Sequence, residues 1–63
     1  MNLTPPAQML TVLEIAAMLG VSKMSVYRLT HNGELEAYRI GRRLLVRRDD
    51  FEAFMRNAKV AQP

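Results

Sequence analysis

The sequence contains no cysteine and a single histidine, His31. Without cysteine the chain can form neither a disulfide framework nor a thiolate metal site, and one histidine cannot make a metal cluster. We therefore expect a core of aliphatic and methionine side chains, with no metal and no cofactor. A nucleophile–base pair and a phosphate-binding glycine loop are also missing, so an enzyme is not expected.

The chain also lacks a long apolar run. Its longest run is far short of the roughly 18 residues that a membrane span needs, and its N-terminus does not resemble a signal peptide. We therefore expect a cytoplasmic protein that is not associated with a membrane. With 63 residues the chain forms one small domain at most. Such a domain buries only about 60% of its unfolded surface, so its stability is marginal.

Positive charge is present but unevenly placed. The formal net charge is +3, with nine Lys and Arg residues against six Asp and Glu residues. Residues 23–48 carry seven basic and two acidic side chains, whereas the remainder of the chain is net negative. Positive charge concentrated in one segment is typical of a protein that binds a polyanion. The basic residues of this segment are Lys23, Arg28, Arg39, Arg42, Arg43, Arg47 and Arg48.

Residues 11–33 have the pattern of two helices joined by a tight turn. Thr11 and Glu14 have the spacing of a capping box, and Gly20 suits the left-handed end of the first helix. Ser22 is the predicted cap of the second helix, which Asn32-Gly33 ends. The apolar positions expected to hold the helices together are Leu13, Ile15, Ala16, Leu19, Val21, Val26 and Leu29. This spacing favours a helix-turn-helix over its structural alternative, a plain helical hairpin.

A basic β-hairpin is predicted next. The side chains of residues 36–40 and 44–48 alternate in character with a period of two, on either side of the turn Gly41-Arg42-Arg43. This is the pattern of two short strands. Asp49 is then the predicted cap of a final helix, and this explains the paired acids Asp49-Asp50 better than catalysis does. We expect further side chains at or near the core. In the final helix they are Phe51, Phe54, Met55 and Ala58, and in earlier segments they are Tyr38, Met18 and Leu45.

The two ends of the chain lack a periodic pattern. Residues 1–10, which include Pro5-Pro6, are expected to form a flexible arm or an extended lead-in, from which Leu3, Met9 or Leu10 docks on the core. Residues 59–63 are expected to be a frayed tail. The predicted domain therefore spans residues 11–58. Its class is mainly α with a small β-hairpin, a winged helix-turn-helix in the order α-α-β-β-α.

The sequence from Ala16 to Leu29, together with Asn32–Arg43 and Val46–Phe54, resembles the excisionase-type, MerR-like winged-helix domain. The resemblance covers about residues 10 to 58. This family includes phage and plasmid excisionases, which are recombination directionality factors, and small stand-alone transcriptional regulators. It implies a recognition helix in the major groove and a wing on the adjacent backbone or minor groove. Two departures stand out: Leu44 occupies a position where the wing often has an aromatic residue, and no counterpart of the MerR dimerisation helix and effector domain is seen.

The resemblance assigns DNA contacts to the second helix and the wing. On the recognition helix these residues are Ser22, Lys23, Met24, Ser25, Tyr27, Arg28 and His31, and on the wing they are Arg39, Gly41, Arg42 and Arg43. Arg28 suits a bidentate contact to guanine O6 and N7, with a phosphate contact equally open, whereas Lys23 favours phosphate. Arg47 and Arg48 are candidate phosphate contacts. Pairing with the acids that follow them competes with this role, and Arg48 is the one we expect to pair.

We therefore expect a sequence-specific double-stranded DNA-binding protein, associated with the nucleoid of a bacterial host cell. The resemblance alone adds an excisionase role, in which the protein binds and bends attachment-site DNA and directs an integrase toward excision. It also suggests two partners besides DNA, a site-specific integrase and further copies of the chain assembling cooperatively on DNA. A stand-alone transcriptional regulator of the same fold and a protein-interaction module without DNA binding are the alternatives.

Overall fold

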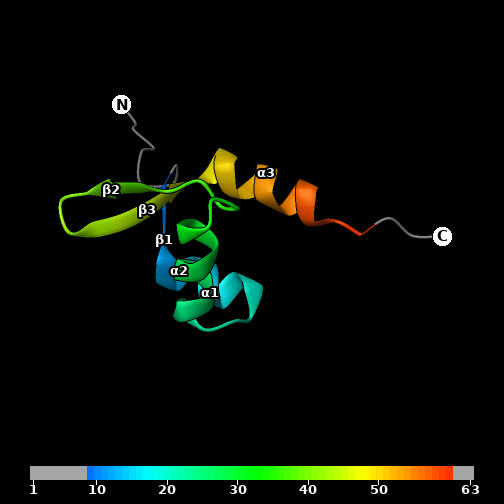
Figure 1. The fold of residues 1–63 in the computed structure, drawn as a ribbon, viewed down its shortest axis with the longest axis horizontal. Helices are drawn as coiled ribbons and strands as arrows, with labels where there is room; N and C mark the ends of the chain where they lie inside the picture. The colour runs from blue at the N-terminus through cyan, green and yellow to red at the C-terminus, as the bar shows by residue number, and fades with distance from the viewer. Residues whose placement is uncertain (1–8, 61–63) are drawn as a thin grey trace, which may run out of the picture.

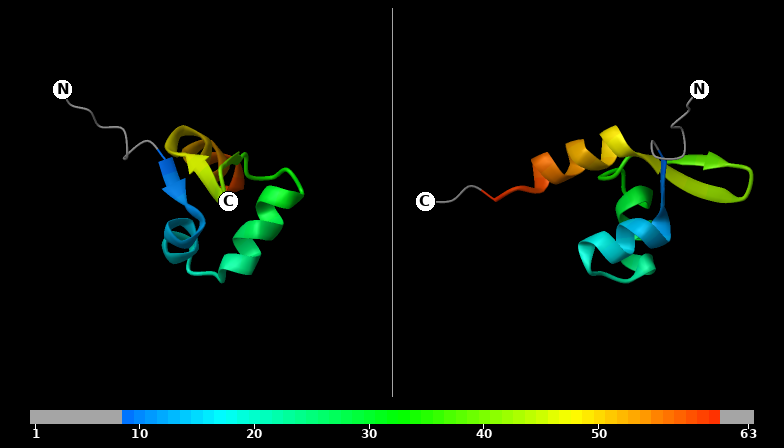
Figure 2. Two further views of the ribbon diagram at one scale, coloured as in Figure 1. Left: turned by 90° about the vertical axis from the view of Figure 1, so that its left-hand side faces the viewer. Right: turned by 180° about the vertical axis from the view of Figure 1, so that it is seen from behind.

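A computed structural model describes residues 9–60, which form three helices and one three-stranded antiparallel sheet (Figure 1). The elements in chain order are β1 (Met9–Thr11), α1 (Val12–Leu19), α2 (Lys23–His31), β2 (Tyr38–Ile40), β3 (Arg43–Arg47) and α3 (Arg48–Ala58). The helices α1 and α2 lie together on one side of the sheet. The β2–β3 hairpin extends to one side of them and α3 to the other (Figures 1 and 2). The fold is the predicted winged helix-turn-helix, with one additional strand.

Helix α1 begins and ends as the sequence predicts. The backbone N–H of Thr11 donates to Glu14 Oε1 at 2.8 Å, and the N–H of Glu14 donates to Thr11 Oγ1 at 3.1 Å, which completes the capping box. At the other end Gly20 has a φ of 70°, and the N–H of Val21 donates to the carbonyl of Ala16 at 3.0 Å. This left-handed ending strains any residue with a Cβ, so the turn between the helices favours glycine.

Helix α2 is followed by a loop that folds back on its end. Asn32 Oδ1 accepts a hydrogen bond from the N–H of Glu34 at 3.1 Å, and the carbonyl of Leu29 accepts one from the N–H of Leu35 at 3.1 Å. These bonds turn the chain toward the core, and the side chain of Leu35 is only 1% exposed. Leu35 is a core residue that the sequence pattern does not predict, because it stands outside any periodic segment.

Strand β1 is the additional element. It pairs with β3 through Leu10 opposite Val46, and β3 pairs on its other side with β2 through Leu44 opposite Arg39. Residues 9 and 10 thus belong to the sheet and not to a flexible arm, which agrees with the alternative of an extended lead-in, and Leu10 docks on the core as one of the predicted candidates. A three-residue strand is too short to show alternation, so only its pairing reveals it. Residues 1–8 of the arm and 61–63 of the tail lie outside the described residues.

The hairpin turn is shorter than predicted. Ile40 pairs with Arg43, which leaves Gly41 and Arg42 as the two loop residues. Gly41 has a φ of 65° and no non-glycine residue from 9 to 60 has a positive φ, which is the pattern of a type II′ turn. Arg43 is therefore the first residue of β3 and not part of the turn.

The start of α3 also differs from the prediction. Arg48 belongs to this helix and not to the strand, and the N-cap is Arg47, which makes no side-chain capping bond. Asp49 is therefore not the cap. Asp49 and Asp50 lie in the first turn, where their charges still favour the positive end of the helix.

The core lies between the sheet and the helices α1 and α2. Its buried side chains are Leu10, Val12, Ile15, Ala16, Val26, Leu35, Val46 and Phe51. Partly buried around them are Leu19, Leu29, Ala37, Leu44 and Phe54. Ala16 and Val26, predicted at the contact between the two helices, are both buried.

Several residues predicted in or near the core are exposed instead. They are Leu13 (65% exposed), Met18 (51%), Val21 (41%), Tyr38 (39%), Met55 (45%) and Ala58. In α1 the cause is periodicity. Val12, Ile15 and Leu19 share the inward stripe at helical spacing, so Leu13 falls about 100° away from it. Within residues 9–60, no helix is long and apolar enough to cross a membrane.

Candidate nucleic-acid interface

The outer side of α2 presents the side chains that the sequence analysis selected. Lys23, Met24, Tyr27, Arg28 and His31 are exposed, whereas Val26 beneath them is fully buried. Val26 and Leu29 pack toward the core at i and i+3 and thereby set the rotation of the helix. The predicted separation into a core face and a free face is therefore present.

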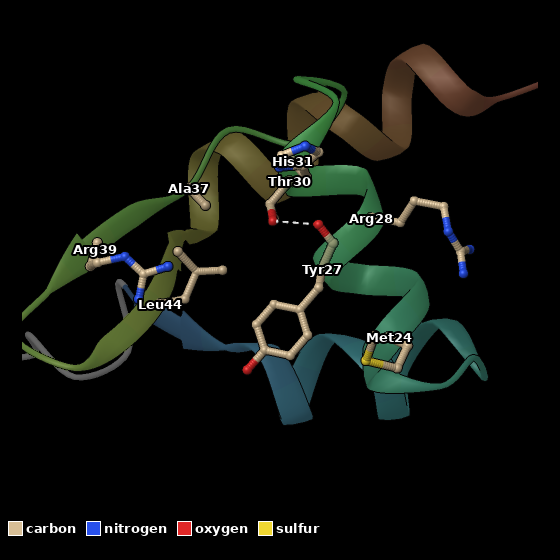
Figure 3. A pocket seen from close by; sticks show the side chains of 8 residues that line it. All are labelled: Met24, Tyr27, Arg28, Thr30, His31, Ala37, Arg39 and Leu44. Carbon is tan, nitrogen blue, oxygen red and sulfur yellow. Dashed lines mark hydrogen bonds between the residues drawn. The ribbon is translucent and has the colours of Figure 1, made fainter.

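A cleft of about 570 Å³ lies between α2 and the wing (Figure 3). It is lined by Met24, Tyr27, Arg28, Thr30, His31, Ala37, Arg39 and Leu44. Figure 3 shows the ring of Tyr27 projecting toward the hairpin, whereas the side chain of Arg28 points away from it. Thr30 Oγ1 donates to the carbonyl of Tyr27 at 2.9 Å and thus stays within its own helix. The fold thus places residues of α2 that are predicted to contact DNA around the same cleft as Arg39 of the wing.

A second hollow of about 260 Å³ lies between the start of α1 and the wing tip. Its lining residues are Thr11, Val12, Leu13, Tyr27, Arg42, Arg43 and Leu44. Tyr27 and Leu44 line both hollows, so the two form one continuous surface, which we call the α2–wing surface. The start of α1 was not predicted as part of this surface. No local pattern could have indicated it, because only the fold brings residues 11–13 beside residues 42–44.

The second hollow is suited to an anion. Its floor includes the N-terminal end of α1, which carries partial positive charge from the helix dipole and from N–H groups without an intrahelical acceptor. Arg42 and Arg43 are both exposed at its edge. Among residues 9–60, no carboxylate lies within ion-pair distance of either guanidinium. The carboxylate of Glu14, which accepts the backbone N–H of Thr11 at 2.8 Å, offsets part of the helix charge, so Arg42 and Arg43 supply most of the attraction for a phosphate here.

Arg47 interacts with side chains of its own chain. Its Nη2 lies 3.7 Å from Asp49 Oδ2, and a hydrogen bond with the Tyr38 side chain, followed by the negative charges of Asp50 and Asp49, raises the pKa of Arg47 above its usual value. Side chains alternate between the two faces of the sheet along β3. Leu44 and its cross-strand partner Arg39 share one face, and Arg47 lies on the other face. Internal pairing is thus seen for Arg47, and the pairing expected for Arg48 stays a prediction. The phosphate contacts of Arg47 and Arg48 stay predictions.

The two serines at the start of α2 serve the helix itself. Ser22 Oγ accepts the backbone N–H of Ser25 at 3.2 Å, and the two hydroxyl oxygens lie 3.2 Å apart. The first role of Ser22 is therefore N-capping, as predicted. In the described part of the chain, no group of three or more His, Asp or Glu side chains is placed to bind a metal ion.

Comparison with known proteins agrees with this geometry. A family model described as "Helix-turn-helix domain" matches residues 9–59. Two relatives in Mycobacterium tuberculosis, "Putative DNA-binding protein Rv0500A" of strain H37Rv and "Putative DNA-binding protein MT0521" of strain CDC 1551, are each 69% identical over 35 residues. Those residues are 56% of this chain and 45% of each relative.

A third relative is much longer than the chain. "Uncharacterized protein YvgK" of Bacillus subtilis is 42% identical over 53 residues, which are 84% of this chain and 17% of that protein. The matched segment thus spans less than half the length of each relative named here. No solved structure matches the chain significantly. Because the family model covers β1 through α3, the chain belongs to the helix-turn-helix domain family.

Proposed function

We propose that the chain binds double-stranded DNA through the α2–wing surface, with α2 in the major groove and the wing on the adjacent backbone or minor groove. The observation that carries the proposal is the continuity of this surface, which joins α2, the start of α1 and two arginines of the wing tip around Tyr27. The M. tuberculosis relatives, which are named as DNA-binding proteins, also support it.

Each part of the surface suits a different part of a duplex. Arg28 projects outward from α2 and suits guanine O6 and N7, while Met24 can contact a thymine methyl group. The second hollow suits a phosphate at the start of α1. Arg42, at the tip of the hairpin, suits a narrow minor groove, where the negative potential is strongest. The proposal requires no catalytic group.

We further propose that the DNA-binding role is architectural. In this role the protein bends attachment-site DNA and directs an integrase toward excision. The support is the resemblance to excisionase-type domains. A regulator of the same fold would instead occupy a single operator, so the number of complexes on one DNA fragment separates the two roles.

The proposal is tested by binding to DNA in a salt series. The purified protein is titrated into its own genomic flanking DNA and into a scrambled duplex of equal length. We expect tighter binding to the flanking DNA, with log affinity falling steeply against log salt because counterions are released from phosphates. A ladder of complexes supports the architectural role. Equal, weak binding to both duplexes contradicts sequence-specific DNA binding and favours the protein-interaction module.

The wing is tested separately by the double substitution Arg42→Ala with Arg43→Ala. If both side chains contact phosphate, the salt slope becomes shallower by about 2, since each contact contributes close to one unit. Arg56→Ala is the control, because it removes a positive charge from α3, outside both hollows of the α2–wing surface. Binding by the double variant that matches the wild type at every salt concentration would remove the wing from the mechanism.

A further inference from the structure

Helix α3 extends beyond the core that anchors it. Figures 1 and 2 show its C-terminal half running away from the sheet and from the other two helices. Phe51 is buried and Phe54 is half-buried at its base. Met55 and Ala58 continue the same stripe at helical spacing, yet Met55 is 45% exposed and Ala58 is exposed. The apolar stripe of α3 is therefore longer than the surface that covers it.

The part of this stripe that the core does not fully cover consists of the half-buried Phe54 and the exposed Met55 and Ala58, and it is here called the α3 tip. Shallow hollows flank Ala58 on two sides. One, of about 430 Å³, is lined by Met55, Arg56, Ala58 and Lys59, and the other, of about 260 Å³, by Glu34, Phe54, Asn57 and Ala58. Because Ala58 is small and lies between two hollows, the side chains of a neighbouring helix can pack into these hollows.

The charges along α3 indicate which neighbouring helix fits the α3 tip. In its N-terminal part the three acidic side chains Asp49, Asp50 and Glu52 outnumber the one basic side chain, Arg48. Its C-terminal end is basic, with Arg56 and, at the C-cap, Lys59. Two such helices side by side in the same direction would place like charges together. In opposite directions they place acidic ends beside basic ends and also oppose their dipoles. The helix is thus complementary to an inverted copy of itself.

The spacing of the charges also defines a register. Glu52 and Lys59 are seven residues apart and therefore lie on the same side of the apolar stripe. In an antiparallel pair centred near Met55, Glu52 of one copy faces Lys59 of the other. Two-fold symmetry makes this contact twice.

We propose that the α3 tip pairs antiparallel with the α3 tip of a second copy of this chain. The wing and α3 extend to opposite sides of α1 and α2, so the pairing leaves the α2–wing surface free (Figure 1). The end of one short helix offers far less than the about 800 Å² per partner of a standard interface, so the dimer is weak in solution. Two copies held next to each other on one DNA raise the effective concentration and favour the pair.

Sedimentation equilibrium of the full chain without DNA tests this proposal independently of the proposed function. In low salt, we expect the average mass to rise from that of the monomer toward twice that value as the concentration increases. Met55→Glu should abolish the rise. Leu13→Glu, an equally polar change at another exposed apolar residue, should not. A wild-type protein that stays monomeric throughout, or unchanged association of Met55→Glu, would overturn the proposal.

Charge reversal tests the antiparallel register. Glu52→Lys and Lys59→Glu should each weaken association about tenfold, because both symmetric contacts then join like charges. The double variant with both changes should associate as the wild type does. An equimolar mixture of the two single variants should also associate, since one then carries only lysines and the other only glutamates at these positions. Failure of the double variant and the mixture to recover association would exclude this register.

Discussion

At the residue scale, Tyr27 and Arg28 are neighbours in the sequence but serve different parts of the α2–wing surface. Successive residues of a helix point about 100° apart, so Tyr27 faces the hairpin while Arg28 points away from it (Figure 3). Tyr27 therefore lies among the side chains of the wing. Arg28 can approach base edges without involving the wing at all.

The position of Arg28 leads to a prediction about specificity. Arg28→Ala should cost about 1–3 kcal/mol of binding free energy on the preferred duplex and much less on a scrambled one, because a bidentate guanine contact is lost. Lys23→Ala should instead weaken binding to both duplexes similarly and reduce the salt slope by about 1. Titrations of both variants on both duplexes measure this. Equal losses on the two duplexes for Arg28→Ala would identify it as a phosphate contact.

At the element scale, β1 is as much part of the fold as the helices are. Leu10 is 5% exposed, and its strand closes one edge of β3 before the chain enters α1 through the capping box of Thr11. The strand therefore connects the sheet directly to the helix-turn-helix. Leu13, three residues later, points about 100° away from the inward stripe of α1 and contributes little to the core.

Leu10 and Leu13 form a matched pair for testing β1. Leu10→Ala should lower the free energy of unfolding by about 2–5 kcal/mol, because it leaves a cavity in the core. Leu13→Ala removes the same atoms from a side chain that is 65% exposed and should change the free energy by less than about 0.5 kcal/mol. Urea unfolding monitored by circular dichroism compares the two. Equal effects would show that β1 does not pack as described.

At the scale of the whole molecule, one strand connects the two extensions of the fold. β3 begins at the hairpin tip, passes through the core at Val46 and continues without a linker into α3, where Phe51 is buried in the same core. The wing and α3 are thus attached rigidly to opposite sides of the helix-turn-helix. The surface proposed to bind DNA and the surface proposed to pair therefore belong to one continuous unit.

Phe51→Ala tests whether α3 belongs to that body. Removing the ring should lower the free energy of unfolding by about 3–5 kcal/mol and should leave a single unfolding transition. Hydrogen exchange should then speed up in α1 and β3 as well as in α3, whereas Glu52→Ala, a change at an exposed site, should have little effect. Faster exchange confined to α3 would show that this helix is an independent appendage.

The sequence by itself determined the local elements of this protein and the concentration of basic charge on α2 and the hairpin. The capping box of Thr11 and Glu14, the glycine between the helices and the cap at Ser22 all join residues at most five apart in the chain. Hydrogen bonds and backbone angles over such short distances leave a pattern in the sequence. The same patterns were sufficient to predict a winged helix-turn-helix.

Only the tertiary structure decided which side chains are covered and which residues meet. β1 exists because β3 lies beside it, and Leu35 is buried because the loop after α2 folds back on the helix end. The start of α1 joins the wing tip around Tyr27, and Arg47 pairs with Asp49 on the other face of the sheet. Most of these arrangements depend on residues far apart in the chain, and in every case packing in three dimensions rather than local periodicity determines the outcome.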